Sequence, residues 1–244
     1  MNKTAIVTGG TSGIGFAISK ALVERGDNVI AIYANNDTKA NNAKETLKTH
    51  TGGDYKVVKL DVTNEDKVKE FFKTLKSCDY LINCAGISIE APFEALPMQD
   101  IKKVIDVNLY GKMICSKYAL PLLKKSSCPR IVNIASRFAQ KPFIEGMMGY
   151  SCSEAGIVMM TKVLALEYAK YNIRVNAVSP SLTLTPLTLD VCTEEEIKTI
   201  SSKNPSKRLG RPEDIANIVM YLCSEQSDYI TGENINVNGG ILLV

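Results

Sequence analysis

The hydrophobic positions of this chain form two kinds of run that alternate along its length. Short apolar runs, typical of strands buried in a parallel sheet, fall at residues 4–7, 29–33, 56–60, 80–83, 130–135, 174–179 and 235–237. Longer stretches with apolar residues at helical spacing fall at residues 16–24, 37–49, 64–75, 100–125, 150–170 and 212–224. This alternation predicts an α/β fold with one doubly wound parallel sheet.

The pattern weakens in one segment near the end of the chain, at about residues 181–211. Thr, Ser and Pro are frequent there, and only one short helix, at residues 193–201, is predicted. A segment of that length without firm elements is typical of a lid or binding loop. No repeat or linker divides the chain, so we expect residues 1–244 to form a single domain with a mobile lid.

Composition and charge exclude several classes of function. The net charge is +3, from 29 basic and 26 acidic residues, and no basic run suggests nucleic-acid binding. No apolar stretch approaches about 18 residues, so neither a membrane span nor a signal peptide is expected. The 7 cysteines contain no C-x-x-C pair, which indicates reduced thiols in a cytoplasmic protein without a metal site. His50 is the single histidine and lies in a polar stretch, so we interpret it as a surface residue.

A glycine-rich turn follows the first predicted strand. Gly9, Gly13 and Gly15 have the spacing G-x-x-x-G-x-G between a strand and a helix. Gly9 permits a sharp exit from the strand, Gly13 lets the backbone approach a pyrophosphate, and Gly15 lets the helix pack close to the sheet. The turn predicts a dinucleotide site at the helix N-terminus, although such turns also occur as plain structural bends.

Motifs along residues 3–240 together resemble the short-chain dehydrogenase/reductase family, and within it most closely the 3-oxoacyl-(acyl carrier protein) reductases. The matches are the T-G-x-x-x-G-x-G turn of residues 8–15, the D-V pair Asp61-Val62, the N-x-A-G of residues 83–86, Asn108, Ser136, the R-P-E-D-I-A of residues 211–216 and the end motif of residues 231–240. The resemblance implies a Rossmann domain that binds a nicotinamide cofactor.

The resemblance also implies which residues hold that cofactor. They are Gly9, Ser12, Gly13, Ile14, Gly15, Tyr33, Asn35, Asp61, Val62, Asn83, Ala85, Gly86, Tyr150, Pro180 and Thr183. Tyr33 stands where an NAD-selecting acid would end the second strand, and Ser12 stands where NADP-dependent relatives often carry a basic residue. Since Ser12, Asn35 and Asn36 offer hydrogen bonds to a 2′-phosphate, we expect NADPH, with NAD less favoured.

The family's catalytic residues are present with one exception. By resemblance Tyr150 protonates the substrate carbonyl, Ser136 hydrogen-bonds the same oxygen, and Asn108 is the family's helix asparagine. The family's lysine, four residues after the tyrosine, is replaced by Glu154. Unit charges about 4 Å apart interact by roughly 4 kcal/mol at an effective dielectric near 20. A carboxylate there opposes ionisation of the phenol, so oxidation should suffer more than reduction.

Lys112 is a second departure, because it follows Asn108 by four residues where relatives commonly have an apolar residue. Helical side chains lean toward the helix N-terminus, so Lys112 is placed to reach over Asn108. Two interpretations stay open. In one, Lys112 supplies the missing cation and Glu154 pairs with it or with ribose hydroxyls. In the other, Lys112 is a solvated lysine beside an inert glutamate.

The expected function is NADPH-dependent reduction of a ketone to a secondary alcohol. The resemblance points to a 3-oxoacyl thioester on an acyl carrier protein, in fatty-acid or polyketide-type synthesis. Lys124, Lys125 and Lys170 could attract an acidic carrier. Ser181, where the family usually has glycine, narrows the nicotinamide end of the pocket. The alternatives are a reductase of a free small ketone, a catalytically silent partner subunit suggested by Glu154, or a base-catalysed dehydration or isomerisation.

The resemblance further implies a homodimer or homotetramer, paired through the two long helices at residues 100–125 and 150–170. The apolar positions that fit this role are Ile114, Tyr118, Leu122, Ile157, Met160 and Leu164. The same positions also fit packing against the sheet.

Overall fold

The computed structural model describes residues 2–48, 50 and 52–243, which contain one parallel sheet in the order β3-β2-β1-β4-β5-β6-β7. Its strands are β1 (Thr4–Thr8), β2 (Asn28–Tyr33), β3 (Tyr55–Lys59), β4 (Tyr80–Asn83), β5 (Arg130–Ile134), β6 (Arg174–Pro180) and β7 (Asn234–Val237). Every neighbouring pair is parallel. The predicted doubly wound sheet is confirmed.

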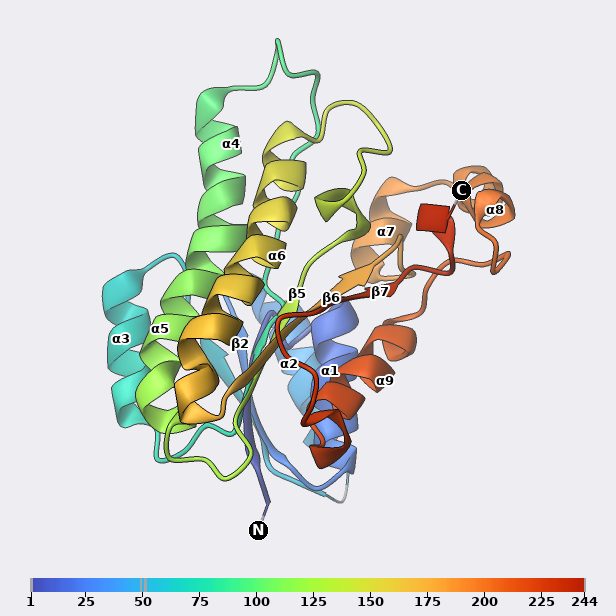
Figure 1. Cartoon of the computed structure of the whole chain (residues 1–244). Coiled ribbons are helices and arrows are strands. Elements are labelled where there is room, and N and C mark those ends of the chain that lie inside the picture. Colours follow the sequence, from blue (N-terminus) through green and yellow to red (C-terminus); the bar gives the residue numbers. More distant parts are fainter. Residues whose placement is uncertain (1, 49, 51, 244) are drawn as a thin grey trace.

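Helices cover both faces of this sheet (Figure 1). They are α1 (Gly13–Glu24), α2 (Asp37–Lys48), α3 (Glu65–Thr74), α4 (Met98–Ile105), α5 (Gly111–Leu123), α6 (Met148–Tyr168), α7 (Pro186–Val191), α8 (Glu194–Lys203) and α9 (Pro212–Leu222). One apolar layer joins the sheet to α1 and α9, and another joins it to α3, α5 and α6. The helix predicted at residues 37–49 ends at Lys48 as far as the chain is described, since Thr49 lies outside the described residues.

The sheet is built outward from β1 in two opposite directions. The chain first builds β2 and β3 on one side, and it then returns to place β4 on the other side of β1. Ligands of doubly wound sheets bind at the carboxyl ends of the strands, at this reversal. Tyr33, Asn83 and the glycine-rich turn after β1 all lie at that edge.

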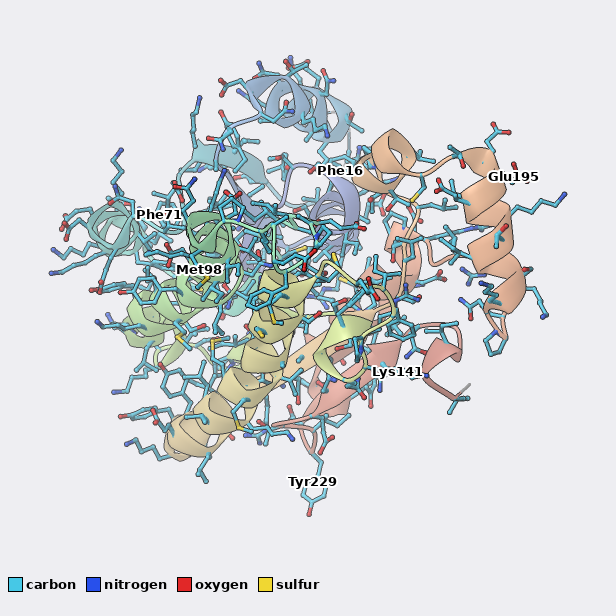
Figure 2. All side chains as sticks on the ribbon, turned by 90° about the horizontal axis from the view of Figure 1, so that it is seen from above. Phe16, Phe71, Met98, Lys141, Glu195 and Tyr229 are labelled. Carbon is cyan, nitrogen blue, oxygen red and sulfur yellow. The ribbon has the colours of Figure 1, made fainter. Side chains whose placement is uncertain are left out.

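The predicted helix of residues 100–125 is interrupted in the structure. A π-helical turn, η1 (Asp106–Tyr110), joins α4 to α5, and Asn108 lies at its centre. Short π-helical turns occur frequently at functional sites, because they shift a side chain out of the regular helical register. In the view from above, the amino end of α6 lies between α4 and a 3₁₀ turn, η2 (Arg137–Ala139) (Figure 2). The label Lys141 marks the chain just after η2.

The segment predicted as a lid carries more regular structure than its sequence pattern indicates. The predicted short helix is α8, and Thr193 and Glu196 form a capping box at its start. The sequence pattern missed α7, which begins at Pro186 with Thr185 as its N-cap. A parallel bridge between Thr183 and Gly210 brings the two ends of the segment together.

Three of the six apolar positions proposed for subunit pairing, Ile114, Ile157 and Met160, are buried against the sheet. Met160 and Leu164 also line a surface groove on these helices. The same helices expose a different apolar set, which is Tyr110, Met113, Met159, Val163 and Leu166. Pairing through these two helices stays a prediction.

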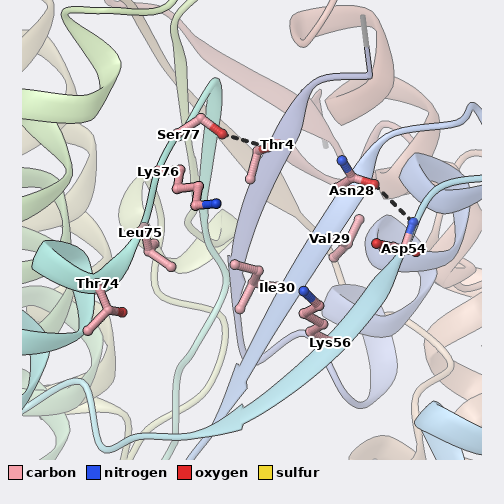
Figure 3. Close-up of a pocket in the computed structure, with 10 residues that line it drawn as sticks. All are labelled: Thr4, Asn28, Val29, Ile30, Asp54, Lys56, Thr74, Leu75, Lys76 and Ser77. Carbon is pink, nitrogen blue, oxygen red and sulfur yellow. Dashed lines mark hydrogen bonds between the residues drawn. The ribbon is translucent and has the colours of Figure 1, made fainter.

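A surface pocket lies at the opposite edge of the sheet from the glycine turn (Figure 3). Its lining comes from the amino ends of β1, β2 and β3 and from residues 74–77, and Thr4 Oγ1 and Ser77 Oγ lie 2.9 Å apart there. Since ligands of this sheet type bind at the carboxyl edge, we do not assign the cofactor to this pocket. None of the described helices is long and apolar enough to cross a membrane.

Candidate active site

The glycine-rich turn has the geometry that a pyrophosphate requires. Gly9 has a φ of 66°, and a Cβ on Gly15 would lie 2.1 Å from Gly9 O, so no side chain fits at Gly15. Thr8 Oγ1 accepts hydrogen bonds from the backbone N–H groups of Cys84 and Ala85 at 3.0 and 3.1 Å. Ser12, the N-cap of α1, makes no side-chain capping bond to a described residue. The first N–H groups of α1 therefore remain open to an anion, which fits a dinucleotide.

A lysine–carboxylate pair lies beside the predicted ribose end of this site. Tyr33 Oη donates to Asp37 Oδ1 at 2.8 Å, and Lys59 Nζ lies 2.8 Å from Asp37 Oδ2. Hydrogen bonds from Lys59 and Tyr33 lower the pKa of Asp37. The sequence analysis missed Asp37 and Lys59, although the register that places Lys59 beside Tyr33 follows from the two predicted strands.

The other residues predicted at this end are arranged as follows. Asn35 is exposed, and Asn36 Oδ1 accepts from Lys39 N at 2.8 Å. Asp61 accepts hydrogen bonds from both the backbone and the hydroxyl of Thr63. Val62 is buried, so its backbone is the part that remains for a ligand.

Asn83 and Asn108 hold the centre of the site through buried amides. Asn83 Nδ2 donates to Ser116 Oγ at 3.1 Å and to Asn133 Oδ1 at 2.9 Å, which ties β4 to α5 and β5. Asn108 Oδ1 accepts from Ile87 N at 2.8 Å, and its Nδ2 donates to Ile87 O at 2.9 Å. Both amides are fully enclosed. They therefore clamp the chain around Ala85 and Gly86, beside the glycine turn.

Ser136 and Tyr150 meet at the carboxyl edge of the sheet. Ser136 follows β5 and caps η2, and Tyr150 lies in the first turn of α6. Burial raises the pKa of Tyr150, and the charge of Glu154 raises it further, while a hydrogen bond with Ser136 and the charge of Arg137 lower it. The environment thus favours the neutral phenol, which is the form that gives up a proton.

Glu154 and Lys112 are both buried next to this pair, with exposed fractions of 4% and 3%. Burial raises the pKa of Glu154 to about 7 against the opposing charge of Lys112. Burial lowers the pKa of Lys112 against the opposing charge of Glu154. Lys112 Nζ donates to Ala85 O at 2.6 Å, and Glu154 Oε2 has no hydrogen-bond partner among the described residues. Lys112 is therefore not a solvated lysine, and the interpretation of it as a surface residue is wrong.

Arg137 is a cation of the site that the sequence analysis missed. Its Nη1 donates to Ser181 Oγ at 3.4 Å, so it joins the turn after β5 to the residue that follows Pro180. Thr183 is buried and its hydroxyl donates to Ser181 O at 2.9 Å. In the segment predicted as a lid, Thr185 Cγ2 lies 3.3 Å from the position of a Cβ on Gly13. This segment therefore packs against the glycine turn.

The lysines proposed to attract a carrier protein lie far from Tyr150. Lys124 and Lys170 both place Nζ over the ring of Tyr171, at 3.8 and 5.2 Å from its centroid. Tyr171 follows the carboxyl end of the 21-residue α6, whereas Tyr150 is at its amino end. At about 1.5 Å per residue these two ends are roughly 30 Å apart. These lysines therefore lie at the other end of α6 from Tyr150, and their contact with a carrier stays a prediction.

Comparison with known proteins agrees with this arrangement. Residues 9–242 match a family model described as enoyl-(acyl carrier protein) reductase. A 3-oxoacyl-(acyl-carrier-protein) reductase FabG of Aquifex aeolicus is 35% identical over 98% of this chain and 97% of its own length. Glucose 1-dehydrogenase 2 of Bacillus subtilis is also 35% identical, over 99% of this chain and 95% of its own length.

Solved structures give the same result for the fold. A putative gluconate dehydrogenase from Agrobacterium tumefaciens superposes with a TM-score of 0.93 at 29% identity, covering 99% of this chain and 96% of the other. The ligand-free aldohexose dehydrogenase of Thermoplasma acidophilum gives a TM-score of 0.86 at 33% identity, covering 100% and 95%. The chain belongs to the short-chain dehydrogenase/reductase family. It is an NAD(P)-dependent oxidoreductase.

Proposed function

We propose that this enzyme reduces a ketone to a secondary alcohol with NADPH, and that the ketone is a 3-oxoacyl thioester on an acyl carrier protein. The observation that carries the proposal is the pairing of Tyr150 with Ser136 at the edge of the sheet that also holds the glycine turn. The thioester is supported by the named activity of the Aquifex aeolicus relative.

The roles of the residues follow from their surroundings. When bound, the nicotinamide cofactor supplies hydride to the carbonyl carbon. The hydroxyl of Ser136 orients the carbonyl oxygen, and Tyr150 gives that oxygen its proton. Asn108 keeps Ile87 and the neighbouring Gly86 in place beside the cofactor.

Lys112 and Glu154 together replace the family's single lysine in this proposal. Lys112 offsets the charge of Glu154 and fixes the backbone at Ala85. Glu154 Oε2, buried without a partner among the described residues, accepts a hydrogen bond from a ribose hydroxyl of the cofactor. A buried acceptor is costly when it has no donor, so the ligand would complete this site.

NADPH is favoured over NADH by the groups near Tyr33. Asp37, the carboxylate at this position, already accepts hydrogen bonds from Tyr33 and Lys59. It is thus less available to two ribose hydroxyls. The ammonium group of Lys59 lies on the same edge and attracts a 2′-phosphate.

The proposal includes an assembly and a moving lid. Two chains pair through the exposed apolar face of α5 and α6, where Leu109, Met113, Gly156, Met159 and Val163 line a groove. The segment from Thr183 to Gly210 opens to admit the substrate. All seven cysteines are free thiols, which suits a reducing compartment such as the cytoplasm.

The test is consumption of NADPH in the presence of an acetoacetyl thioester, offered on coenzyme A and on an acyl carrier protein. NADH is the cofactor control, and Tyr150→Phe is the catalytic control. We expect turnover with NADPH, faster on the carrier protein, and its loss in the Tyr150→Phe enzyme. Turnover that survives this substitution would overturn the assigned roles.

A free sugar or small ketone is the second candidate, because glucose and aldohexose dehydrogenases are among the relatives. Aldohexoses with NAD or NADP test this candidate in the same assay. Tight NADPH binding without turnover of any of these substrates would instead favour a silent partner subunit.

A further inference from the structure

The positive charge that acts on Tyr150 comes from an unexpected residue. Lys112 directs its ammonium group to Ala85 O at 2.6 Å, and its charge acts on Glu154, Cys84 and Cys115. The cation whose charge lowers the pKa of Tyr150 is Arg137, against the effects of burial and of Glu154. The cation whose charge acts on Glu154 and the cation whose charge acts on the phenol are therefore different residues.

The position of Arg137 is set by three contacts. It directly follows Ser136, and its Nη1 donates to Ser181 Oγ at 3.4 Å. Its guanidinium carbon lies over the rings of Phe143 and Phe138, at 4.0 and 5.4 Å from their centroids. The Phe138 ring in turn packs edge-on against Tyr150, with centroids 5.7 Å apart. One aromatic frame thus holds both the guanidinium and the phenol.

Arg137 also lacks a carboxylate partner among the described residues. Burial lowers its pKa, while the charge of Tyr150 raises it. A guanidinium remains protonated in such surroundings. A partly desolvated cation without an anion interacts more strongly with a negative charge that develops nearby.

We propose that Arg137 performs the electrostatic part of the missing lysine's role. When Tyr150 transfers its Oη proton to the substrate oxygen, the phenol becomes a phenolate, and Arg137 stabilises that charge against Glu154. The phenolate then regains a proton from solvent. Arg137 is a positioning residue that acts through Tyr150, and the inference rests on the proposed ketone reduction.

The groups that face Tyr150 come from several elements. Glu154 lies on the same helix, Arg137 on η2, and Cys84 in the turn after β4, while Ser136 gives a hydrogen bond. Lys112 faces Glu154 from α5. Above about pH 7 Glu154 carries its charge and opposes the phenolate. Arg137 keeps its positive charge in the same range, so it is the cation that acts against Glu154 there.

The test compares Arg137→Met with Arg137→Lys, and uses Lys69→Met, an exposed residue of α3, as a control for the loss of one positive charge. Oxidation of a 3-hydroxybutyryl thioester with NADP is followed from about pH 7 to about pH 10, where tyrosinate is the base. We expect Arg137→Met to lower kcat about tenfold or more and to displace the pH profile upward by about one unit. Arg137→Lys should recover most of the rate, with KM nearly unchanged in both.

The opposite pattern would overturn the inference. If Arg137→Met raised KM for the thioester and left kcat and the pH profile in place, Arg137 would bind an anionic part of the substrate instead. Equal losses in Arg137→Met and Arg137→Lys would also reject an electrostatic role.

A second readout needs no turnover. The ultraviolet absorbance of tyrosinate is titrated in each chain and in its Tyr150→Phe counterpart, and the difference isolates Tyr150. Because burial and Glu154 already raise the pKa of Tyr150, its ionisation begins only at strongly alkaline pH, and Arg137→Met should move that onset to a still higher pH. An unchanged difference would reject the inference even if the protein reduced no ketone at all. A failure of the ketone assay alone would reject only the proposed function.

Discussion

Two lysine–carboxylate pairs at the same edge of the sheet behave in opposite ways. Lys59 and Asp37 are in direct contact at 2.8 Å, and their side chains are 55% and 58% exposed. Their hydrogen bond raises the pKa of Lys59 and lowers that of Asp37, so both charges are reinforced. Lys112 and Glu154 form no ion pair within 4.0 Å among the described contacts. Burial nevertheless lowers the pKa of Lys112 and raises that of Glu154, so it favours the neutral form of each side chain.

The difference shows that burial, more than contact, decides what a charged pair does. Two exposed charges keep their hydration, so a direct contact changes little. Two buried charges lose their hydration. Each is then stabilised by the charge of the other even without contact, because the protein interior screens charges poorly. The pair that does not touch is therefore the one that should control stability and catalysis.

Glu154→Lys should give the largest effect, because it places two cations in the buried site. A buried charge without its partner typically costs about 3 to 5 kcal/mol of unfolding free energy. We expect a loss of this size in urea denaturation and little remaining NADPH turnover, although the substitution restores the family's Y-x-x-x-K pattern.

The matched control for this substitution is the double variant Glu154→Lys with Lys112→Val, which rebuilds the pattern without the second cation. It should recover stability and activity together. A single Glu154→Lys enzyme that is more active than the original would contradict the pairing of Lys112 with Glu154.

The pH dependence of stability should differ between the two carboxylates. Burial raises the pKa of Glu154 from 4.5 to about 7, so the folded chain holds more protons than the unfolded chain between these values. The contribution of Glu154 is thus fully present below about pH 4.5 and is lost as the pH rises through about 7. Relative to Glu154→Gln, the unsubstituted chain should lose unfolding free energy across this window.

Asp37→Asn is the control for that experiment. The pKa of Asp37 is lowered from 3.8, so its contribution is lost only in acid below that value. The stability difference for Asp37→Asn should stay level from about pH 5 to about pH 8. If the stability difference for Asp37→Asn changed with pH as steeply as that for Glu154→Gln, the two pairs would not differ in the way described.

The smallest effect is expected at the exposed pair. Lys59→Met should leave the melting temperature unchanged and raise KM for NADPH about three- to tenfold, with little change for NADH. Added salt should reduce this difference, since both groups are exposed. An equal change in KM for both cofactors would show that Lys59 does not select the 2′-phosphate.

Much of the fold was predictable because its determinants are local. The apolar runs gave the strands, and Asn64, whose Oδ1 accepts from Lys67 N at 3.0 Å, marked the start of α3. The π-helical turn at Asn108 was not predictable, since one wider turn leaves the apolar spacing on either side almost unchanged. The short α7 was missed because Pro186 and the surrounding Thr residues are equally typical of a loop.

The candidate site likewise contains residues that the sequence predicts and others that it does not. Ser136, Tyr150 and Asn108 are marked by family motifs, so their positions follow from the sequence alone. Arg137 belongs to no such motif, and its contacts Phe143 and Ser181 come from separate segments. The exposed apolar positions of α5 and α6 could not be separated from the buried ones, because helical spacing shows that a helix has an apolar stripe but not which side the sheet covers.

The packing of α1 against α9 has a consequence for how the chain folds during synthesis. Ile18 and Leu22 of α1 share one apolar layer with Ile215 and Val219 of α9. Helix α1 is synthesised long before α9, so its inner face is not fully covered until α9 has been made. Contacts this distant in sequence slow folding, and the nascent chain exposes apolar surface until α9 emerges. Shortening the chain before α9 should thus produce aggregation during translation, not a smaller folded enzyme.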